Sequence, residues 1–212
     1  MTKVVLYDYW RSSASYRVRI ALNLAQINYD TVVVDLLKQE HKGEDNLARN
    51  PQGLVPSLYI DGELFTQSLA IIEYLNLTRN LQLLPSSPAD QARVRAMAYA
   101  IAMDIHPVCN MGVASHVMAL TGGGDAVRLA WMQKFIGEGL RGVELMLQQS
   151  PGILSFGDSP TLADLCLLPQ VYNAVRWSVP LDDKPRIAAV AKALERVPAF
   201  AAAHPDHHTH LV

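Results

Sequence analysis

The chain has 212 residues, of which half are hydrophobic and 18% charged, and its formal net charge is -2. This composition describes a globular protein with a substantial core, in one large domain or two small ones. A near-neutral charge without a Lys/Arg cluster argues against a nucleic-acid binder. The N-terminal apolar run is too short for a signal peptide, no stretch is apolar enough to span a membrane, and Cys109 and Cys166 fit no metal or redox spacing. We therefore expect a cytoplasmic protein that binds neither membrane nor nucleic acid.

The first 80 or so residues alternate in type. Lys3–Tyr9 is rich in Val and Tyr and predicts a strand, after which Val18, Ala21 and Leu22 recur at the spacing of a helix face. Thr31–Asp35 is short and apolar, which is typical of a strand inside a covered sheet.

A hairpin follows the polar segment Lys38–Asn50. The apolar runs Pro56–Ile60 and Glu63–Phe65 are separated by Asp61 and Gly62, and a Gly in this place accepts the positive φ that a type I′ turn needs. A further helical pattern comes directly after it. This order of elements predicts a mixed sheet with helices packed on it.

The rest of the chain is predicted to be helical. Helix-period apolar patterns run over Val94–Val108, Met132–Met146 and Ile187–Leu194. Thr161 and Asp164 have the spacing of a capping box that opens another helix. The run Leu-Pro-Ser-Ser-Pro at 84–88 is a linker, so we expect an α/β domain over 1–83 and an all-α domain over 89–212.

Arginine and serines meet where the first strand joins the first helix. If that helix begins near Ser13, its free N–H groups and positive dipole end lie beside Ser12, whose hydroxyl can donate to an anion such as a thiolate. Arg11 is a second candidate for holding an anion. A serine here is equally explained as a plain helix N-cap, and we expect Arg17 and Arg19 to face solvent or an ion pair.

Two more polar joints flank the predicted hairpin. Pro56, at the head of a strand, cannot donate to the sheet and belongs at an edge or beside a ligand. Gln67 and Ser68 lead from a strand into a helix, where a carboxylate can dock at the helix N-terminus. Ser68 alone is also explained as an N-cap.

Together these three joints resemble the pattern of the glutathione transferase superfamily. The segments WRSSASYRVRIALNL, NPQGLVPSLYIDGELFTQSLAIIEYL, DIHPVCN and SFGDSPTLADLCLLPQVYNAVRW resemble the zeta class over nearly the whole chain. The resemblance implies a thioredoxin-like N-terminal domain with a mixed four-stranded sheet, an all-helical C-terminal domain, a homodimer, and glutathione as the cofactor. It also implies a cis peptide bond between Val55 and Pro56. The implied glutathione contacts in the first domain are Ser12 and Ser13 at the sulfur, His41 at the glycyl end, Val55 and Pro56 at the cysteinyl unit, and Gln67 and Ser68 at the γ-glutamyl carboxylate.

In the second domain the resemblance points to the segment that contains Asp104, His106 and Asn110. His106 and Asn110 are four residues apart and would share one helix face, which Pro107 would bend. The resemblance places all three at the glutathione and substrate cleft, although a satisfied buried histidine is the usual alternative. Arg176 matches the family's arginine for a substrate carboxylate, and its plain alternative is a favourable charge near a helix C-terminus.

The activity that the resemblance implies is the cis–trans isomerisation of a small diacid, maleylacetoacetate, in tyrosine and phenylalanine or related aromatic catabolism. Glutathione thiolate would add to the double bond, the single bond would rotate, and glutathione would be eliminated, while Arg11 and Arg176 hold carboxylates and stabilise the enolate. Maleylpyruvate isomerisation is the nearest alternative, although Met111 stands where that branch would have an arginine. A detoxifying transferase or peroxidase is another, as is a catalytically idle fold, against which the intact site residues argue.

Two features depart from this pattern. Ala14 stands where the zeta signature commonly has a cysteine, so any mechanism that needs that cysteine is closed to this chain. The tail from His204 to His210 holds four histidines, which suit Zn or Ni, but no further ligand is spaced to complete a closed site. We expect no metal there.

Overall fold

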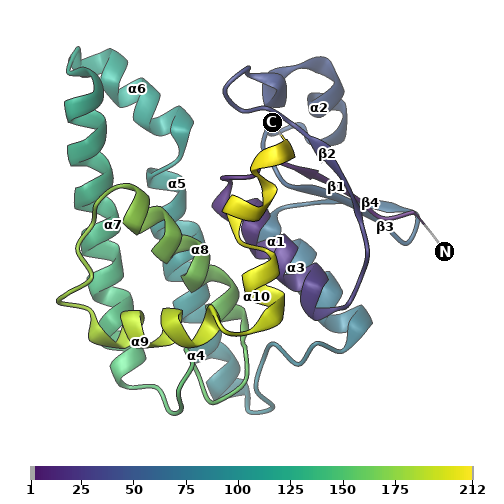
Figure 1. The fold of residues 1–212 in the computed structure, drawn as a ribbon, viewed down its shortest axis with the longest axis vertical. Helices are drawn as coiled ribbons and strands as arrows, with labels where there is room; N and C mark the ends of the chain where they lie inside the picture. The colour runs from purple at the N-terminus through teal and green to yellow at the C-terminus, as the bar shows by residue number, and fades with distance from the viewer. Residues whose placement is uncertain (1–2, 212) are drawn as a thin grey trace. The chain divides into compact units, whose positions relative to one another are not determined.

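A computed structural model describes residues 3–211 of the chain. These residues fall into two compact units (Figure 1). The first unit runs to Gln82 and also contains the chain from Val197 onward, and the second spans Leu83–Arg196.

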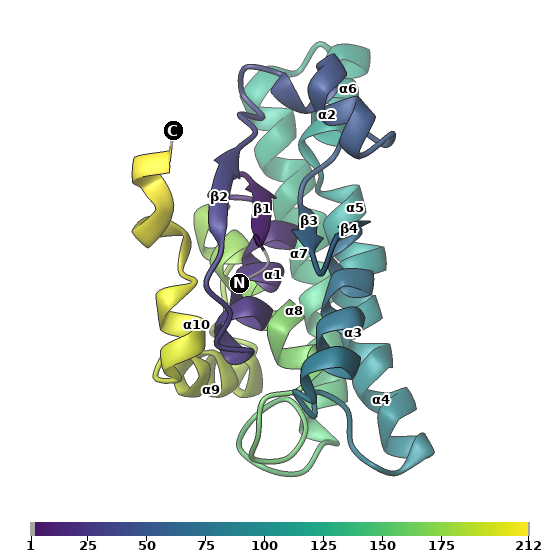
Figure 2. The same cartoon turned by 90° about the vertical axis from the view of Figure 1, so that its right-hand side faces the viewer.

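The first unit is built on a four-stranded mixed sheet. Its strands lie in the order β2-β1-β3-β4, which can be followed across Figure 2, with β1 parallel to β2 and antiparallel to β3. This confirms the predicted sheet. Its elements up to the end of α3 are β1 (Val5–Asp8), α1 (Ser13–Leu24), β2 (Asp30–Val33), η1 (Glu40–Lys42), α2 (Glu44–Arg49), β3 (Ser57–Ile60), β4 (Glu63–Thr66) and α3 (Ser68–Arg79).

The hairpin between β3 and β4 forms as the sequence predicts. Ile60 pairs with Glu63, and the two turn residues Asp61 and Gly62 have φ of 56° and 88°. Positive φ at both positions is what a type I′ turn requires. This turn sets the register that carries Thr66 opposite Ser57 at the far end of the hairpin.

Strand β2 corrects one expectation. It lies at the edge of the sheet, paired with β1 alone, and Val32 remains 40% exposed. The apolar run in this segment therefore does not mark a strand covered on both sides. Burial comes only beyond the strand, where Val34 and Asp35 are buried.

The core of the first unit comes from the sheet and from α1 and α3, which pack against each other. Leu6 of β1, Leu58 of β3, Ile20 of α1, and Ile71 and Ile72 of α3 are each at most 1% exposed. Burying a side chain of this size stabilises the fold by about 1.5–3 kcal/mol. The core thus fixes both helices, and with them the loops that lead into them.

The end of the chain packs on the first unit, in α10 (Pro198–Ala202) and η3 (Pro205–Leu211). Asn23 Nδ2 donates to Ala199 O at 2.9 Å and Arg19 Nε donates to Ala203 O at 3.1 Å, which holds α10 beside α1 (Figure 1). The sequence-based division assigned this segment to the helical domain. The difference arises because long-range side-chain bonds, rather than a local pattern, hold it to α1.

The second unit is entirely helical over the residues described, as predicted. The long helix α7 packs along α6, and α8 packs on α4 and α9. Helix α4 begins at Pro88, which the sequence assigned to the linker. Its elements are α4 (Pro88–Tyr99), the π-helical η2 (Ala100–Ile105), α5 (His106–Val108), α6 (Met111–Thr121), α7 (Gly124–Gln148), α8 (Leu162–Arg176) and α9 (Pro185–Leu194).

A capping box opens α8, as the sequence predicts. Thr161 N donates to Asp164 Oδ2 at 2.7 Å, and Ser155 N donates to Asp164 Oδ1 at 2.9 Å. Burial raises the pKa of Asp164, and the hydrogen bonds from Ser155 and Thr161 oppose that rise. Among residues 3–211, no helix has the length and apolar character needed to cross a membrane.

Candidate functional site

Three segments that carry predicted site residues meet at one edge of the sheet. Tyr7 of β1 pairs with Ser57 of β3, and Ser57 pairs with Thr66 of β4, so these three residues form a row across the strands. The β1–α1 joint follows one end of this row. The Val55–Pro56 dipeptide precedes its middle member, and the entry to α3 follows its last member. The register therefore brings together polar groups that lie more than fifty residues apart in sequence.

Ser12 occupies the N-cap position of α1. Its φ and ψ are -67° and 118°, and its Oγ accepts a hydrogen bond from Ser15 N at 3.2 Å. Because the oxygen accepts, the hydroxyl hydrogen remains to be donated to a ligand. The cap and the anion-binding interpretation are therefore compatible. Ser13 begins the helix and is buried.

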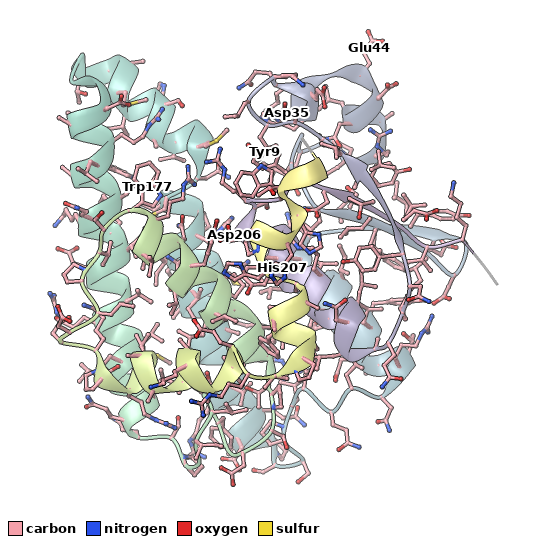
Figure 3. All side chains as sticks on the ribbon, viewed as in Figure 1. Tyr9, Asp35, Glu44, Trp177, Asp206 and His207 are labelled. Carbon is pink, nitrogen blue, oxygen red and sulfur yellow. The ribbon has the colours of Figure 1, made fainter. Side chains whose placement is uncertain are left out.

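Arg11 is held beside this N-terminus by aromatic side chains. Its Nη2 lies 3.4 Å from Tyr9 Oη, and its guanidinium carbon lies 4.6 Å from the centre of the Trp10 ring. Tyr9, labelled in Figure 3, is itself buried. Arg11 Nε is buried without a hydrogen-bond partner among the residues described. A half-buried guanidinium whose Nε is a buried, unused donor suits an anionic ligand.

Gln67 and Ser68 form the entry to α3. Gln67 occupies the N-cap position with φ of 67° and ψ of 113°, and its side chain makes no cap hydrogen bond. Because Ser68 is already the first residue of the helix, the plain N-cap interpretation of Ser68 is wrong. Gln67 Nε2 instead donates to Gln52 Oε1 at 2.6 Å. Ser68, the first helical residue, is buried and accepts from Arg17 Nη1 at 3.3 Å.

The peptide bond between Val55 and Pro56 is cis, as the resemblance implied. Val55 lies just before β3 and is half-buried. Within the described part of the chain, no backbone hydrogen bond to Val55 is found. Its N–H and C=O can therefore pair with an extended peptide as a short added strand.

His41 lies in η1, in the loop that leads toward this edge. Its Nδ1 is buried and has no hydrogen-bond partner among the residues described. Burial lowers the pKa of His41, and the neighbouring Lys42 charge lowers it further. This shift favours the neutral ring, which donates a hydrogen bond at one nitrogen and accepts one at the other. Lys42 Nζ donates to Gln52 O at 3.3 Å, which places a cation in the same loop.

Sequence reasoning missed the burial of Arg17 and Arg19, although the ion pair that it allowed is present at Arg19. Both are buried, at 2% and 0% exposed, so neither faces solvent. Arg19 forms the predicted ion pair, with Asp8 at 2.7 Å. A signal was present, because Arg17 lies three and four residues before Ile20 and Ala21 and so shares their buried face.

In the second unit the predicted arrangement of His106 and Asn110 is wrong. Helix α5 ends at Val108, and Asn110 has extended backbone angles of -66° and 147°. Its Oδ1 accepts from Gly112 N at 2.9 Å, so Asn110 is the N-cap of a new helix, α6. The two side chains therefore do not share one helix face. Asp104 lies exposed in the π-helical η2, two residues before His106.

Arg176 is the last residue of α8. Its guanidinium carbon lies 5.0 Å from the centre of the ring of Trp177, which is labelled in Figure 3. A cation at this end also interacts favourably with the helix dipole. Its role toward a substrate stays a prediction, as do the roles of Asp104, His106 and Asn110.

The histidine-rich tail was considered as a metal site because clustered imidazoles suit Zn or Ni. Among the side chains that the structure describes, no group of three or more His, Cys, Asp or Glu residues could hold a metal ion. His204 Nδ1 lies 3.8 Å from Asp206 Oδ2, and Asp206 and His207 are labelled in Figure 3. The side chain of His210 lies outside the described residues.

The sheet order, the cis proline and the polar groups at one sheet edge define a glutathione transferase N-terminal unit. The family described as glutathione S-transferase, N-terminal domain, matches residues 6–81. Maleylacetoacetate isomerase of Rhizobium meliloti (strain 1021) is 60% identical over 206 residues, which cover 96% of this chain and 97% of the relative. The chain belongs to the maleylacetoacetate isomerase family, the zeta class of glutathione transferases.

Solved structures agree with this assignment. A holo structure of maleyl pyruvate isomerase, described as a bacterial zeta-class glutathione S-transferase, is 40% identical with a TM-score of 0.92, covering 95% of this chain and 96% of that one. A maleylacetoacetate isomerase from Methylobacterium extorquens AM1, with bound malonate and glutathione, is 36% identical with a TM-score of 0.91 over the same shares of the two chains.

Proposed function

We propose that this protein is a glutathione-dependent cis–trans isomerase that converts maleylacetoacetate to its trans isomer. The observation that carries the proposal is the row of paired residues that brings the Ser12 joint, Val55 and the Gln67–Ser68 joint to one sheet edge. Each of these segments offers the kind of group that one part of glutathione needs. The name of the relative at 60% identity supports the choice of substrate.

The residues present fit glutathione. His41 Nδ1 is a buried polar atom without a hydrogen-bond partner among the described residues, so it is available to a polar group of glutathione. We propose that Val55 pairs with the cysteinyl backbone beside Pro56, that His41 serves the glycyl end, and that Gln67 and Ser68 hold the γ-glutamyl end.

Glutathione, when bound, supplies a thiolate that adds to the double bond and leaves again after the single bond has rotated. Ser12 and Ser13, at the N-terminus of α1, stabilise the negative charge on the sulfur through the hydroxyl hydrogen of Ser12 and the helix N–H groups. Arg11 and Arg176 hold the carboxylates of the diacid and stabilise negative charge that develops next to the double bond. For Asp104, His106 and Asn110 we retain the proposed role in binding glutathione.

Maleylpyruvate is the second candidate substrate, because a maleyl pyruvate isomerase has a TM-score of 0.92 to this structure. Residue 111 argues for the longer diacid. Met111 begins α6, is 38% exposed and offers no positive charge where an arginine would be expected for maleylpyruvate. A transferase or peroxidase that consumes glutathione is a third candidate, and the pathway context is proposed to be aromatic catabolism.

We also propose that the protein is a homodimer. Large apolar side chains of the first unit remain exposed, among them Leu64 at 40% and Leu77 at 81%. Light scattering coupled to gel filtration tests this proposal, and a monomer mass at micromolar concentration would contradict it.

The test of function is to supply maleylacetoacetate and maleylpyruvate separately, with and without a catalytic amount of glutathione. We expect isomerisation of maleylacetoacetate that depends on glutathione and leaves its concentration unchanged. Faster turnover of maleylpyruvate would reassign the substrate. Stoichiometric loss of glutathione, or no turnover of either diacid, would overturn the isomerase.

A further inference from the structure

A buried arginine of α1 contacts the first residue of α3. Arg17 is 2% exposed, and its Nη1 donates to Ser68 Oγ at 3.3 Å, across fifty-one positions of sequence. Ser68 is 6% exposed. We infer that Arg17 is a positioning residue that makes the Ser68 hydroxyl a dedicated donor to the α-carboxylate of the γ-glutamyl group.

The direction of this hydrogen bond decides what Ser68 can do. A guanidinium has five donors and no acceptor, so Ser68 Oγ must be the acceptor in this contact. A serine hydroxyl has only one hydrogen, and that hydrogen cannot point at the arginine. It therefore points to another acceptor, and polarisation by the cation makes it a stronger donor.

Charge around the serine also favours an anion. Ser68 is in the first turn of α3, where the free N–H groups give a partial positive charge, and this turn contains no acidic residue. Arg17 adds a full positive charge behind the hydroxyl. The γ-glutamyl end of glutathione has an α-carboxylate, the one charged group that these donors match, so the inference rests on the proposed glutathione site.

Arg19 provides a natural contrast on the same helix. It is fully buried too, but it pairs with Asp8 at 2.7 Å and donates to the backbone oxygens of Trp10 and Ala203. These partners belong to β1 and to chain segments outside α3. Arg19 is thus a structural cation, and its removal should not change which ligand the protein prefers.

The test compares glutathione with 4-aminobutanoyl-cysteinylglycine, which lacks only the α-carboxylate. Their dissociation constants are measured by calorimetry for the unmodified protein, Arg17→Met, Ser68→Ala and the double variant. We expect each single variant to lower the preference for glutathione roughly tenfold, since Ser68→Ala removes the hydrogen bond to the charged carboxylate and Arg17→Met removes the cation that orients and strengthens it. The double variant should lower it little further, because the two residues act as one unit. Equal weakening of both ligands, or additive single effects, would overturn the inference.

A matched control removes the other buried cation of α1. Asp8→Asn combined with Arg19→Met should leave the preference for glutathione unchanged, and a loss equal to that of Arg17→Met would contradict a specific role. If Arg17→Met does not fold, Arg17→Lys and Arg17→Gln replace it. The lysine variant should then keep more of the preference than the glutamine variant, and equal values would count against Arg17.

Steady-state kinetics separates positioning from structure. In Arg17→Met we expect a higher KM for glutathione, with kcat at saturating glutathione and the KM for the diacid unchanged. A fall in kcat together with a similar rise in both KM values would mean general damage to the protein and would count against a positioning role. If the unmodified protein binds no glutathione, the proposed function fails as well. If it binds and isomerises while Arg17 variants keep full selectivity, only this inference fails.

Discussion

Substituting Ser12 separates its two roles, because the cap and the donor have different energetic costs. Ser12 Oγ accepts from Ser15 N at 3.2 Å, and its hydroxyl hydrogen is proposed to reach the glutathione sulfur. Replacing an N-cap serine by alanine costs about 1 kcal/mol of stability, whereas glycine costs only a few tenths. Both substitutions remove the hydroxyl entirely.

The catalytic cost should be the same for both substitutions. A hydrogen bond to a charged group contributes about 1.5–3 kcal/mol, and about 1.4 kcal/mol corresponds to one pKa unit. The bound thiol should therefore have its pKa raised by about one to two units in Ser12→Ala and in Ser12→Gly alike. For a bound thiol whose pKa is near 7, this lowers the thiolate fraction at neutral pH by about fivefold for one unit and about fiftyfold for two.

The assay is a pH titration of thiolate absorbance in the ultraviolet with glutathione bound, alongside urea unfolding of each variant. Ser12→Thr, which keeps a hydroxyl and caps nearly as well, is the control that should retain both properties. The reasoning is refuted if the thiol pKa follows stability, so that glycine stays close to the unmodified protein while alanine does not. That result would make Ser12 a cap only.

Three further predictions concern other groups. Arg176→Ala should raise the KM for the diacid far more than the KM for glutathione, and equal effects in steady-state kinetics would mean that Arg176 is structural. Arg19→Met should lower the free energy of unfolding in urea by about 3–5 kcal/mol because it leaves the buried Asp8 unpaired, whereas the double variant with Asp8→Asn should lose less. Burial raises the pKa of Cys109 from 9.0 to about 11, so its thiol should resist alkylation in the native protein at neutral pH. Because the neutral form is favoured on folding, its contribution to stability should be complete below about pH 9 and fall as pH rises toward 11, which unfolding curves across this range would show.

The features that the sequence predicted correctly are determined by interactions between residues close together in the chain. The Asp61–Gly62 turn needs positive φ at both positions, and the capping box of Thr161 and Asp164 lies within one helical turn. Each depends on residues less than four positions apart. Propensity and side-chain hydrogen bonds therefore predict them without knowledge of the fold.

Long-range contacts explain what could not be predicted. The contact between Arg17 and Ser68 forms only because the fold brings α3 next to α1. The final segment belongs to the first unit because Arg19 and Asn23 donate hydrogen bonds to its backbone oxygens. The predicted arrangement of His106 and Asn110 is wrong for a local reason. The backbone leaves helical geometry at Cys109, and a new helix, α6, begins after Asn110. The spacing of four residues between His106 and Asn110 stays the same across such a break, so spacing alone cannot detect it.

Because Ala14 stands where the zeta class commonly has a cysteine, the reacting sulfur has to come from glutathione, and the strength of the donor beside it can be estimated. The chain has two cysteines, both in the second unit, and both are buried, so the first turn of α1 has no thiol of its own. The sulfur must therefore come from glutathione, and it has to add to carbon and also leave again.

A free thiol has a pKa of about 8.5, and the attacking thiol is most effective when its pKa is near the ambient pH. A lowering of about one to two units by Ser12 brings the value close to neutral, because one hydrogen bond is worth that much. A full ion pair at the sulfur would lower the pKa further and weaken its attack on carbon. A single hydroxyl at a helix N-terminus is thus the donor whose strength suits a reversible addition.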